Sequence, residues 1–290
     1  MKCGLISDLH LEEFPCYVSQ ERGFYKNHPE IFDSIFELEP PSQKLDILFV
    51  AGDFCEFRHQ SLWFKMLDKV SHFAEMIVFV DGNHEHWRTR YQKMPEFVEA
   101  LKSRYDNIEF LCNESFVYKN LEVFGTCLWT DFGFNEYIMQ TIGDKYSPLR
   151  VDKNLKRIKW QQGGFRNARA RDIQLLSMKA KKETVKWLSK SKGTLNKRLL
   201  LTHYPPLPDA VYIDDDNGKI DPETALALSK IELTDLSDEL IDHTDVVIAH
   251  GHLHSAKSYA SKTGHKVYCN PRGILNKMRP KEYRVLEFEV

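Results

Sequence analysis

Residues 45–53, Leu-Asp-Ile-Leu-Phe-Val-Ala-Gly-Asp, place an apolar run directly before a glycine and an aspartate. An apolar run of this length is typical of a short buried strand, and the glycine lets the chain turn sharply where the strand ends. Residues 2–7 and 76–80 form two further runs of the same kind, and apolar residues with helical spacing separate the three runs: Ile31, Ile35 and Leu38, then Leu62, Met66, Leu67 and Val70. This alternation predicts a mainly parallel sheet covered by helices.

Shorter patterned segments continue along the rest of the chain. We expect helices at 92–105, 169–189 and 231–241, and strands at 108–111, 116–118, 121–125, 198–202, 245–249, 255–260, 266–270 and 284–289. The strands between 108 and 125 indicate a meander that joins a second sheet, and the last strands are expected to form hairpins.

These elements predict the α/β class, as a four-layer α-β-β-α sandwich of two mixed sheets with flanking helices. We expect a single domain over residues 1–290. Two stretches without regular strand patterning, 130–192 and 204–230, are expected to be cap or insertion segments. Loops mounted on a rigid scaffold commonly carry recognition, so substrate specificity is expected in these two segments.

The bulk sequence favours a cytoplasmic protein without membrane contact. No apolar run approaches the roughly 20 residues that a membrane span needs, and the N-terminal residues become polar too early for a signal peptide. Six cysteines occur without a Cys-x-x-Cys pair, and we expect them to be free thiols.

Charge is unevenly distributed along the chain. Residues 151–192 contain thirteen lysines and arginines against three acidic residues, whereas the whole chain has a net charge of −2. A basic segment of this kind can attract phosphates or nucleic acid, or it can be the solvated face of a helix. The sequence leaves both alternatives open.

Potential metal ligands follow five of the expected strands. They are Asp8 and His10, Asp53, Asn83, His203, and finally His252 and His254. His84 and Glu85 follow Asn83 directly. We expect His84 to point away from the metals, and Glu85 either to cap the following helix or to hold a histidine. Two residues that are two positions apart in an extended segment point to the same side, so Asp8 and His10 can bind one ion together, and His252 and His254 have the same spacing. Carboxylate oxygens and imidazole nitrogens together suit a pair of divalent transition metals, and one carboxylate can bridge the two ions.

The order of these motifs, D-x-H, G-D-x-x-D, G-N-H-D/E, H and G-H-x-H, resembles the calcineurin-like metallophosphoesterase superfamily, and further details resemble its small bacterial and phage members. The resemblance implies that Asp8, His10, Asp53 and His254 hold one ion, and that Asp53, Asn83, His203 and His252 hold the other. The sequence has Glu56 where the second motif ends in Asp. Mn, Fe, Zn, Ni and Co all suit these donors, and manganese is favoured.

The resemblance also implies a mechanism and its residues. Two ions that share Asp53 would generate a bridging hydroxide, which attacks the phosphorus in line. His84 is expected to protonate the leaving group or to stabilise the transition state, and Asn83 and His84 are expected to contact the substrate. Arg272 either reaches a phosphate or packs against the sheet.

The expected substrate is a phosphodiester, with a nucleotide or nucleic acid favoured because of the basic segment. A phosphomonoesterase or protein phosphatase is one alternative. A metal-binding interaction module without turnover is another, because the superfamily includes a retromer subunit of that kind. The sequence leaves the oligomeric state open.

Overall fold

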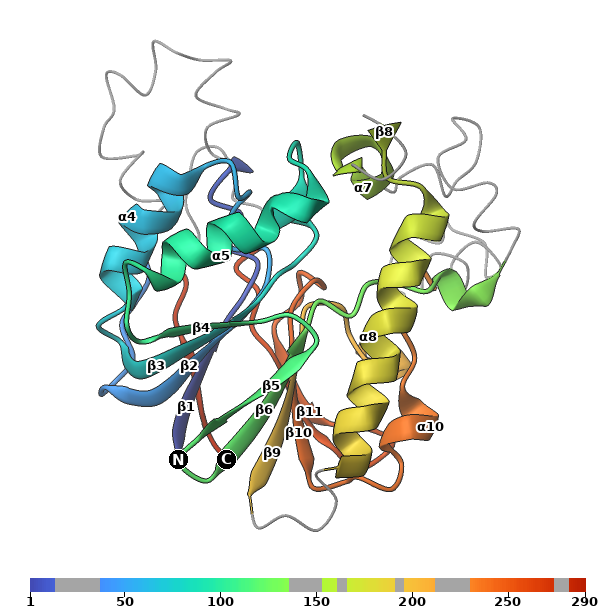
Figure 1. The fold of residues 1–290 in the computed structure, drawn as a ribbon. Coiled ribbons are helices and arrows are strands. Elements are labelled where there is room, and N and C mark those ends of the chain that lie inside the picture. The colour runs from blue at the N-terminus through green and yellow to red at the C-terminus, as the bar shows by residue number, and fades with distance from the viewer. Residues whose placement is uncertain (14–36, 136–152, 161–165, 191–195, 212–229, 274–281) are drawn as a thin grey trace.

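The computed structural model describes residues 1–13, 37–135, 153–160, 166–190, 196–211, 230–273 and 282–290. Two β-sheets pack face to face, and helices cover the outer face of each sheet (Figure 1). This arrangement confirms the predicted four-layer α/β fold. The predicted helical segment at 31–38 lies almost wholly outside the described residues, as do large parts of the two predicted insertions. The single-domain assignment stays a prediction.

The first sheet has the strand order β13-β1-β2-β3-β4. Its strands are β1 (Lys2–Ile6), β2 (Leu45–Ala51), β3 (Ala74–Val80), β4 (Ile108–Leu111) and β13 (Leu286–Glu289). The strands β1 to β4 run parallel, whereas β13 is antiparallel to β1. The prediction that the last strand closes a hairpin was therefore wrong, because β13 crosses to the other sheet and covers the edge of β1.

The second sheet has the order β11-β12-β10-β9-β6-β5. Its strands are β5 (Glu114–Tyr118), β6 (Leu121–Thr126), β9 (Lys197–Thr202), β10 (Val246–His250), β11 (Lys257–Ala260) and β12 (Lys266–Cys269). The central strands are parallel, and an antiparallel hairpin stands at each edge. The predicted meander is thus divided, with β4 in the first sheet and the β5–β6 hairpin in the second.

Helices α4 (Gln60–Val70) and α5 (Met94–Lys102) cover the first sheet, and α8 (Ala170–Lys190) and α10 (Ser237–Leu240) cover the second (Figure 1). The shorter elements are the 3-10 helices η1 (His84–His86), η2 (Tyr91–Lys93), η3 (Phe132–Phe134) and η4 (Pro208–Ala210), the helix α7 (Lys153–Arg157), and the two-residue strands β7 (Lys159–Trp160) and β8 (Arg166–Asn167). No helix among the described residues has the length and apolar character that a membrane crossing needs.

Of the helix predicted at 231–241, only the four residues Ser237–Leu240 form a helix. The backbone N–H groups of Thr234 and Leu236 donate to the carbonyls of Pro205 and Pro206, and the Thr234 hydroxyl donates to the carbonyl of Trp129. Tertiary partners thus take the hydrogen bonds that a helix would have used, so apolar spacing was a wrong guide at this position.

The two sheets meet across a tightly packed apolar layer in which Leu5, Phe49 and Leu201 are completely buried. At Gly125 in β6 the two sheets lie close together. A Cβ atom there would lie 2.4 Å from the Cβ of Leu111 and 2.9 Å from a methyl carbon of Val80 in the first sheet. No side chain fits between the sheets at this position without displacing one of them.

We expect Gly125→Ala to lower the free energy of unfolding by about 1–3 kcal/mol, because overpacking forces neighbouring side chains or strands apart. Urea denaturation followed by circular dichroism measures the change. Val117→Ala in the exposed β5 edge is the control, with an expected change below about 0.5 kcal/mol. If Gly125→Ala unfolds at the same urea concentration as the wild type, the prediction is wrong and the two sheets can accommodate a methyl group at this position.

Candidate metal centre

The potential ligands identified from the sequence meet at one edge of the two sheets. Each follows the carboxyl end of a strand: β1 precedes Asp8 and His10, β2 precedes Asp53, β3 precedes Asn83, β9 precedes His203, and β10 precedes His252 and His254. Because these strands are parallel within their sheets, their carboxyl ends open at a common edge. Seven donors separated by up to 246 positions in the chain therefore form one cluster.

The backbone at these positions is locally strained. Asp8, His10, Asp53 and His252 all have positive φ angles, between 46° and 67°. Non-glycine residues adopt this region rarely, and where they do the surrounding structure holds them. Here the N–H of Asp8 donates to the Gly52 carbonyl at 3.0 Å, and that of His10 donates to the Asp53 carbonyl at the same distance.

Glycine is required where these loops come closest together. A Cβ on Gly82 would lie 2.3 Å from Oδ1 of Asp53, and a Cβ on Gly52 would lie 2.5 Å from Nδ1 of His203. Gly52 also has a φ of 78°, which other residues adopt only with strain. The glycines that precede the proposed ligands thus allow the donor groups to converge.

One donor set contains Asp8, His10 and His254. The Nε2 atoms of the two histidines lie 3.0 Å apart, and Oδ1 of Asp8 lies 3.6 Å from Nε2 of His254. A transition metal binds imidazole nitrogen at about 2.0–2.1 Å, so two nitrogens on one ion at nearly right angles are about 3 Å apart. The spacing of the two histidines fits such an ion.

The second donor set surrounds Nε2 of His203. This atom lies 2.9 Å from Oδ1 of Asn83, 3.2 Å from Nδ1 of His252 and 3.4 Å from Oδ1 of Asp53. The other oxygen of Asp53, Oδ2, faces the first set and lies 3.8 Å from Nε2 of His10. One carboxylate therefore presents an oxygen to each set, and the residues fit two divalent ions that share Asp53.

Hydrogen bonds outside the donor sets orient two of the histidines. Nδ1 of His203 donates to the Ala51 carbonyl at 2.9 Å, and Nε2 of His252 donates to the carboxylate of Glu232 at 2.7 Å. In each case the second ring nitrogen is left with its lone pair toward the donor set, as a metal ligand requires. The sequence contained no signal for Glu232, which is separated from His252 by 20 positions.

Glu85 joins the ends of two strands. Its buried carboxylate accepts hydrogen bonds from the N–H groups of Asp53, Phe54 and Gly82. Burial raises the pKa of Glu85, and the backbone donors act in the opposite direction. Of the two roles considered for it from the sequence, capping a helix or holding a histidine, the structure shows neither; the side chain instead fixes the loop that carries Asp53.

His84 lies beside the first donor set and has a carboxylate partner. Its Nδ1 donates to Oε1 of Glu12 at 2.7 Å, and its Nε2 lies 3.9 Å from Oδ2 of Asp53. Burial lowers the pKa of His84, whereas the hydrogen bond to Glu12 raises it. Glu12 is itself buried, and it was not identified from the sequence because nothing in its local pattern shows that it meets a side chain 72 positions away.

Three nearby residues are placed away from the donor sets. His86 is fully buried and hydrogen-bonds Asp81 at 2.7 Å, so it does not border an open pocket. His250 is also buried and contacts the carbonyl of Gly251. Arg272 is 4% exposed, and its guanidinium donates to the carbonyl of Leu9. This is the packing alternative considered for it from the sequence.

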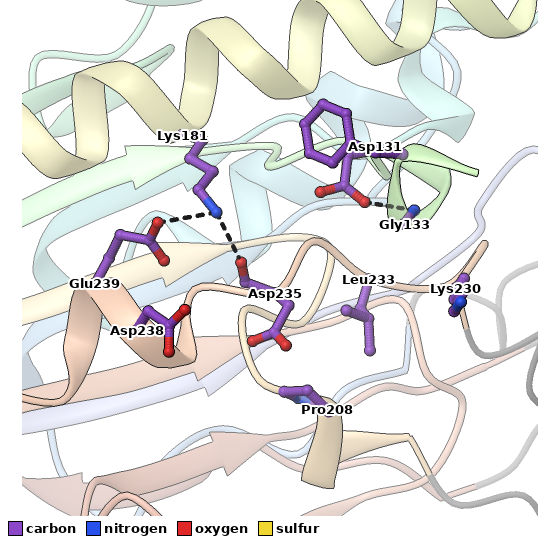
Figure 2. A pocket seen from close by; sticks show the side chains of 10 residues that line it. Asp131, Gly133, Lys181, Pro208, Lys230, Leu233, Asp235, Asp238 and Glu239 are labelled. Atoms are coloured by element: carbon purple, nitrogen blue, oxygen red, sulfur yellow. Dashed lines mark hydrogen bonds and ion pairs between the residues drawn. The ribbon is translucent and has the colours of Figure 1, made fainter. Parts of the chain in front are cut away.

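The described parts of the two predicted insertion segments line a common cavity. The cavity has a volume of about 470 Å³ and is lined by Asp131, Lys181, Pro208 and Lys230 among others (Figure 2). Lys181 reaches across it to Glu239 and to the carbonyl of Asp235. Lys230 and Leu233 line the cavity, and Glu232, which accepts the hydrogen bond from His252, lies between them in the sequence.

We expect the purified, metal-loaded protein to contain about two divalent ions per chain. His254→Ala and His203→Ala should each reduce the content to about one ion, because each removes a ligand from one set, and Asp53→Asn should weaken both sites. Inductively coupled plasma mass spectrometry after dialysis measures the content. His72→Ala, at an exposed position outside the cluster, is the control, and two retained ions in His254→Ala would contradict the assignment.

Comparison with known proteins agrees with this geometry. The calcineurin-like phosphoesterase family profile matches residues 1–256. An uncharacterised protein of Acanthamoeba polyphaga mimivirus is 23% identical over 210 residues, which are 70% of this chain and 67% of that protein. The acyl-carrier-protein phosphodiesterase PptH of Mycobacterium tuberculosis is 32% identical over 128 residues, which are 44% of this chain but only 32% of that protein.

Solved structures extend the similarity of fold. The crystal structure of the phosphopantetheinyl hydrolase PptH superposes with a TM-score of 0.58 at 16% identity, covering 94% of this chain and 89% of that chain. The family profile spans most of the sequence and includes both donor sets. The chain therefore belongs to the calcineurin-like phosphoesterase family of dinuclear metal-dependent hydrolases.

Proposed function

We propose that this protein hydrolyses phosphodiesters, with the seven donors holding two metal ions and His84 acting on the leaving group. The observation that carries this proposal is the pair of buried side chains His84 and Glu12, whose hydrogen bond leaves Nε2 of His84 facing Asp53. An ester oxygen that leaves as an alkoxide needs a proton. A histidine protonated on both ring nitrogens can supply it from Nε2, while its Nδ1–H stays on the carboxylate of Glu12. The printed name of the relative PptH, a phosphodiesterase, also supports this reaction.

Each residue has a separate task in this reaction. The bound ions would neutralise charge on the phosphate and lower the pKa of a water molecule. Asp53 sets the distance between the two donor sets, and Asn83 offers its amide to the phosphate from the second set. Glu12 holds Nδ1 of His84, so that Nε2 is the nitrogen that meets the leaving oxygen.

Charge at the site favours a diester over a monoester. A phosphomonoester carries about two negative charges near neutral pH and a diester one, so a monoester site needs more positive side chains. Arg58 and Arg88 are both paired with Glu56. Arg272 is turned toward the carbonyl of Leu9. These three arginines are therefore engaged within the protein and do not supply that charge.

Further expectations are part of the proposal. The oxygen donors Asp8, Asp53 and Asn83 support manganese among the candidate metals. The described cysteines are free, which supports a reducing compartment such as the cytoplasm. Within the basic segment, Lys179, Lys182 and Lys186 are exposed on α8, as expected of a solvated helix face, whereas Arg157 lies beside the centre and supports an anionic, nucleotide-type substrate.

Hydrolysis of bis(p-nitrophenyl) phosphate, p-nitrophenyl phosphate and a phosphoserine peptide by the manganese-loaded protein tests the substrate class. We expect the highest kcat/KM for the diester, because Arg58, Arg88 and Arg272 are engaged within the protein and do not compensate the second charge of a monoester. Higher activity on the peptide would favour a protein phosphatase. A protein that binds two metals but hydrolyses none of the three would favour an interaction module.

We expect His84→Ala to keep both metals and to lose about 10²- to 10⁴-fold in kcat on the dinucleotide TpT, whose alkoxide leaving group needs a proton. The loss should be smaller for bis(p-nitrophenyl) phosphate, because nitrophenolate leaves without one. Glu12→Gln should show the same pattern to a lesser degree, with Glu99→Gln, at an exposed position of α5, as its control. An equal loss on both substrates would contradict proton donation, and a lost ion in His84→Ala would make His84 a ligand.

A further inference from the structure

Arg157 is joined to the candidate catalytic residue by a stack of three side chains. Its guanidinium carbon lies 4.0 Å above the ring centre of Trp87. The indole of Trp87 in turn stacks on His84, with ring centroids 3.3 Å apart and an interplanar angle of 29°. Arg157 is the last residue of α7, which lies at the ligand-bearing end of the molecule (Figure 1). The guanidinium is therefore on the side of the centre where His84 stands.

The backbone fixes this arginine in place. The N–H of Arg88 donates to the Arg157 carbonyl at 2.8 Å, and Trp87 forms an antiparallel bridge with Ile158. The N–H of Lys159 donates to the carbonyl of Thr89 at 3.0 Å. A segment of the first predicted insertion is thus hydrogen-bonded to the loop that carries His84. A side chain mounted in this way loses little conformational entropy when it binds a ligand.

Arg157 differs from its neighbours in its charge partners. Arg58 and Arg88 share the carboxylate of Glu56, whereas no carboxylate within the described part of the chain forms an ion pair with Arg157. Its guanidinium uses one face on Trp87, and its N–H groups point outward in the plane of the group, where they can bind an anion. It is half-buried, so such an interaction is only partly screened by water.

We propose that Arg157 binds a second anionic group of the substrate, carried on the alcohol that leaves past His84. This inference rests on the proposed function. The preferred substrates would then be phosphodiesters in which the leaving alcohol bears a further phosphate, as in phosphorylated oligonucleotides and related nucleotide esters. A guanidinium suits this task because its parallel N–H groups match two oxygens of one phosphate.

Binding of ligands that resemble the leaving side of the uncleaved substrate tests the proposal without turnover. One phosphate stands for the scissile group and the other for the second anionic group. Calorimetry on the manganese-loaded protein compares thymidine 3′,5′-bisphosphate with thymidine 5′-monophosphate. We expect the bisphosphate to bind about ten- to a hundredfold more tightly, the size of one or two charge-assisted hydrogen bonds. Arg157→Gln should remove this difference and leave the affinity for the monophosphate nearly unchanged. Arg157→Lys keeps the positive charge but lacks the two parallel N–H groups of a guanidinium. Its preference for the bisphosphate should lie between that of the wild type and that of Arg157→Gln.

Lys156→Gln is the matched control, because it removes one charge from the adjacent exposed position and should change both affinities by less than about twofold. Equal weakening of both ligands by Arg157→Gln would overturn the proposal, since it would show that the arginine only supports the Trp87–His84 stack. An undiminished preference for the bisphosphate would overturn it as well. A wild-type protein that prefers the bisphosphate yet cleaves no diester would contradict the proposed function and leave the anion site standing.

Discussion

The carboxylate of Asp53 is the group on which the rest of the centre depends. One oxygen faces His203 and the other faces His10, while the backbone N–H of His84 donates to Oδ1 at 2.8 Å. Burial, together with the nearby charges of Glu85 and Asp8, raises the pKa of Asp53 well above its ordinary value. Such a concentration of buried acid is costly unless positive charge compensates it, and two divalent ions would do so.

The distance between the donor sets follows from the packing of two sheets. Asp8, His10 and Asp53 come from loops of the first sheet, whereas His203 and His252 come from the second. The apolar layer around Gly125 holds the sheets together, and Glu85 ties the loop of β2 to that of β3. The stability of this interface and the geometry of the centre are therefore coupled, although no residue of the apolar layer is a donor.

Recognition and chemistry meet at His84. Glu12, in the loop after β1, hydrogen-bonds to Nδ1 of His84. Trp87 stacks on the His84 ring, and the guanidinium of Arg157 lies over Trp87. The scaffold thus supplies the two donor sets and His84, and a predicted insertion supplies a positive charge beside them. In this arrangement specificity can change through the insertion without movement of the donors, because α7 contributes to the rim and not to either donor set.

The sequence by itself determined the strands, the layered fold and the membership of the donor cluster. Apolar runs report local burial, and parallel strands bring the residues after them to one edge whatever their separation in the chain. Tertiary structure decided the rest. The backbone N–H of Thr234 donates to the carbonyl of Pro205 in a distant loop, so this segment is not helical. The strand β13 pairs with β1 and not with its neighbours in sequence. Glu12 and Glu232 hydrogen-bond to histidines, and the guanidinium of Arg272 points into the protein. Such contacts depend on the directions of side chains in three dimensions, and periodicity along the chain does not encode these directions.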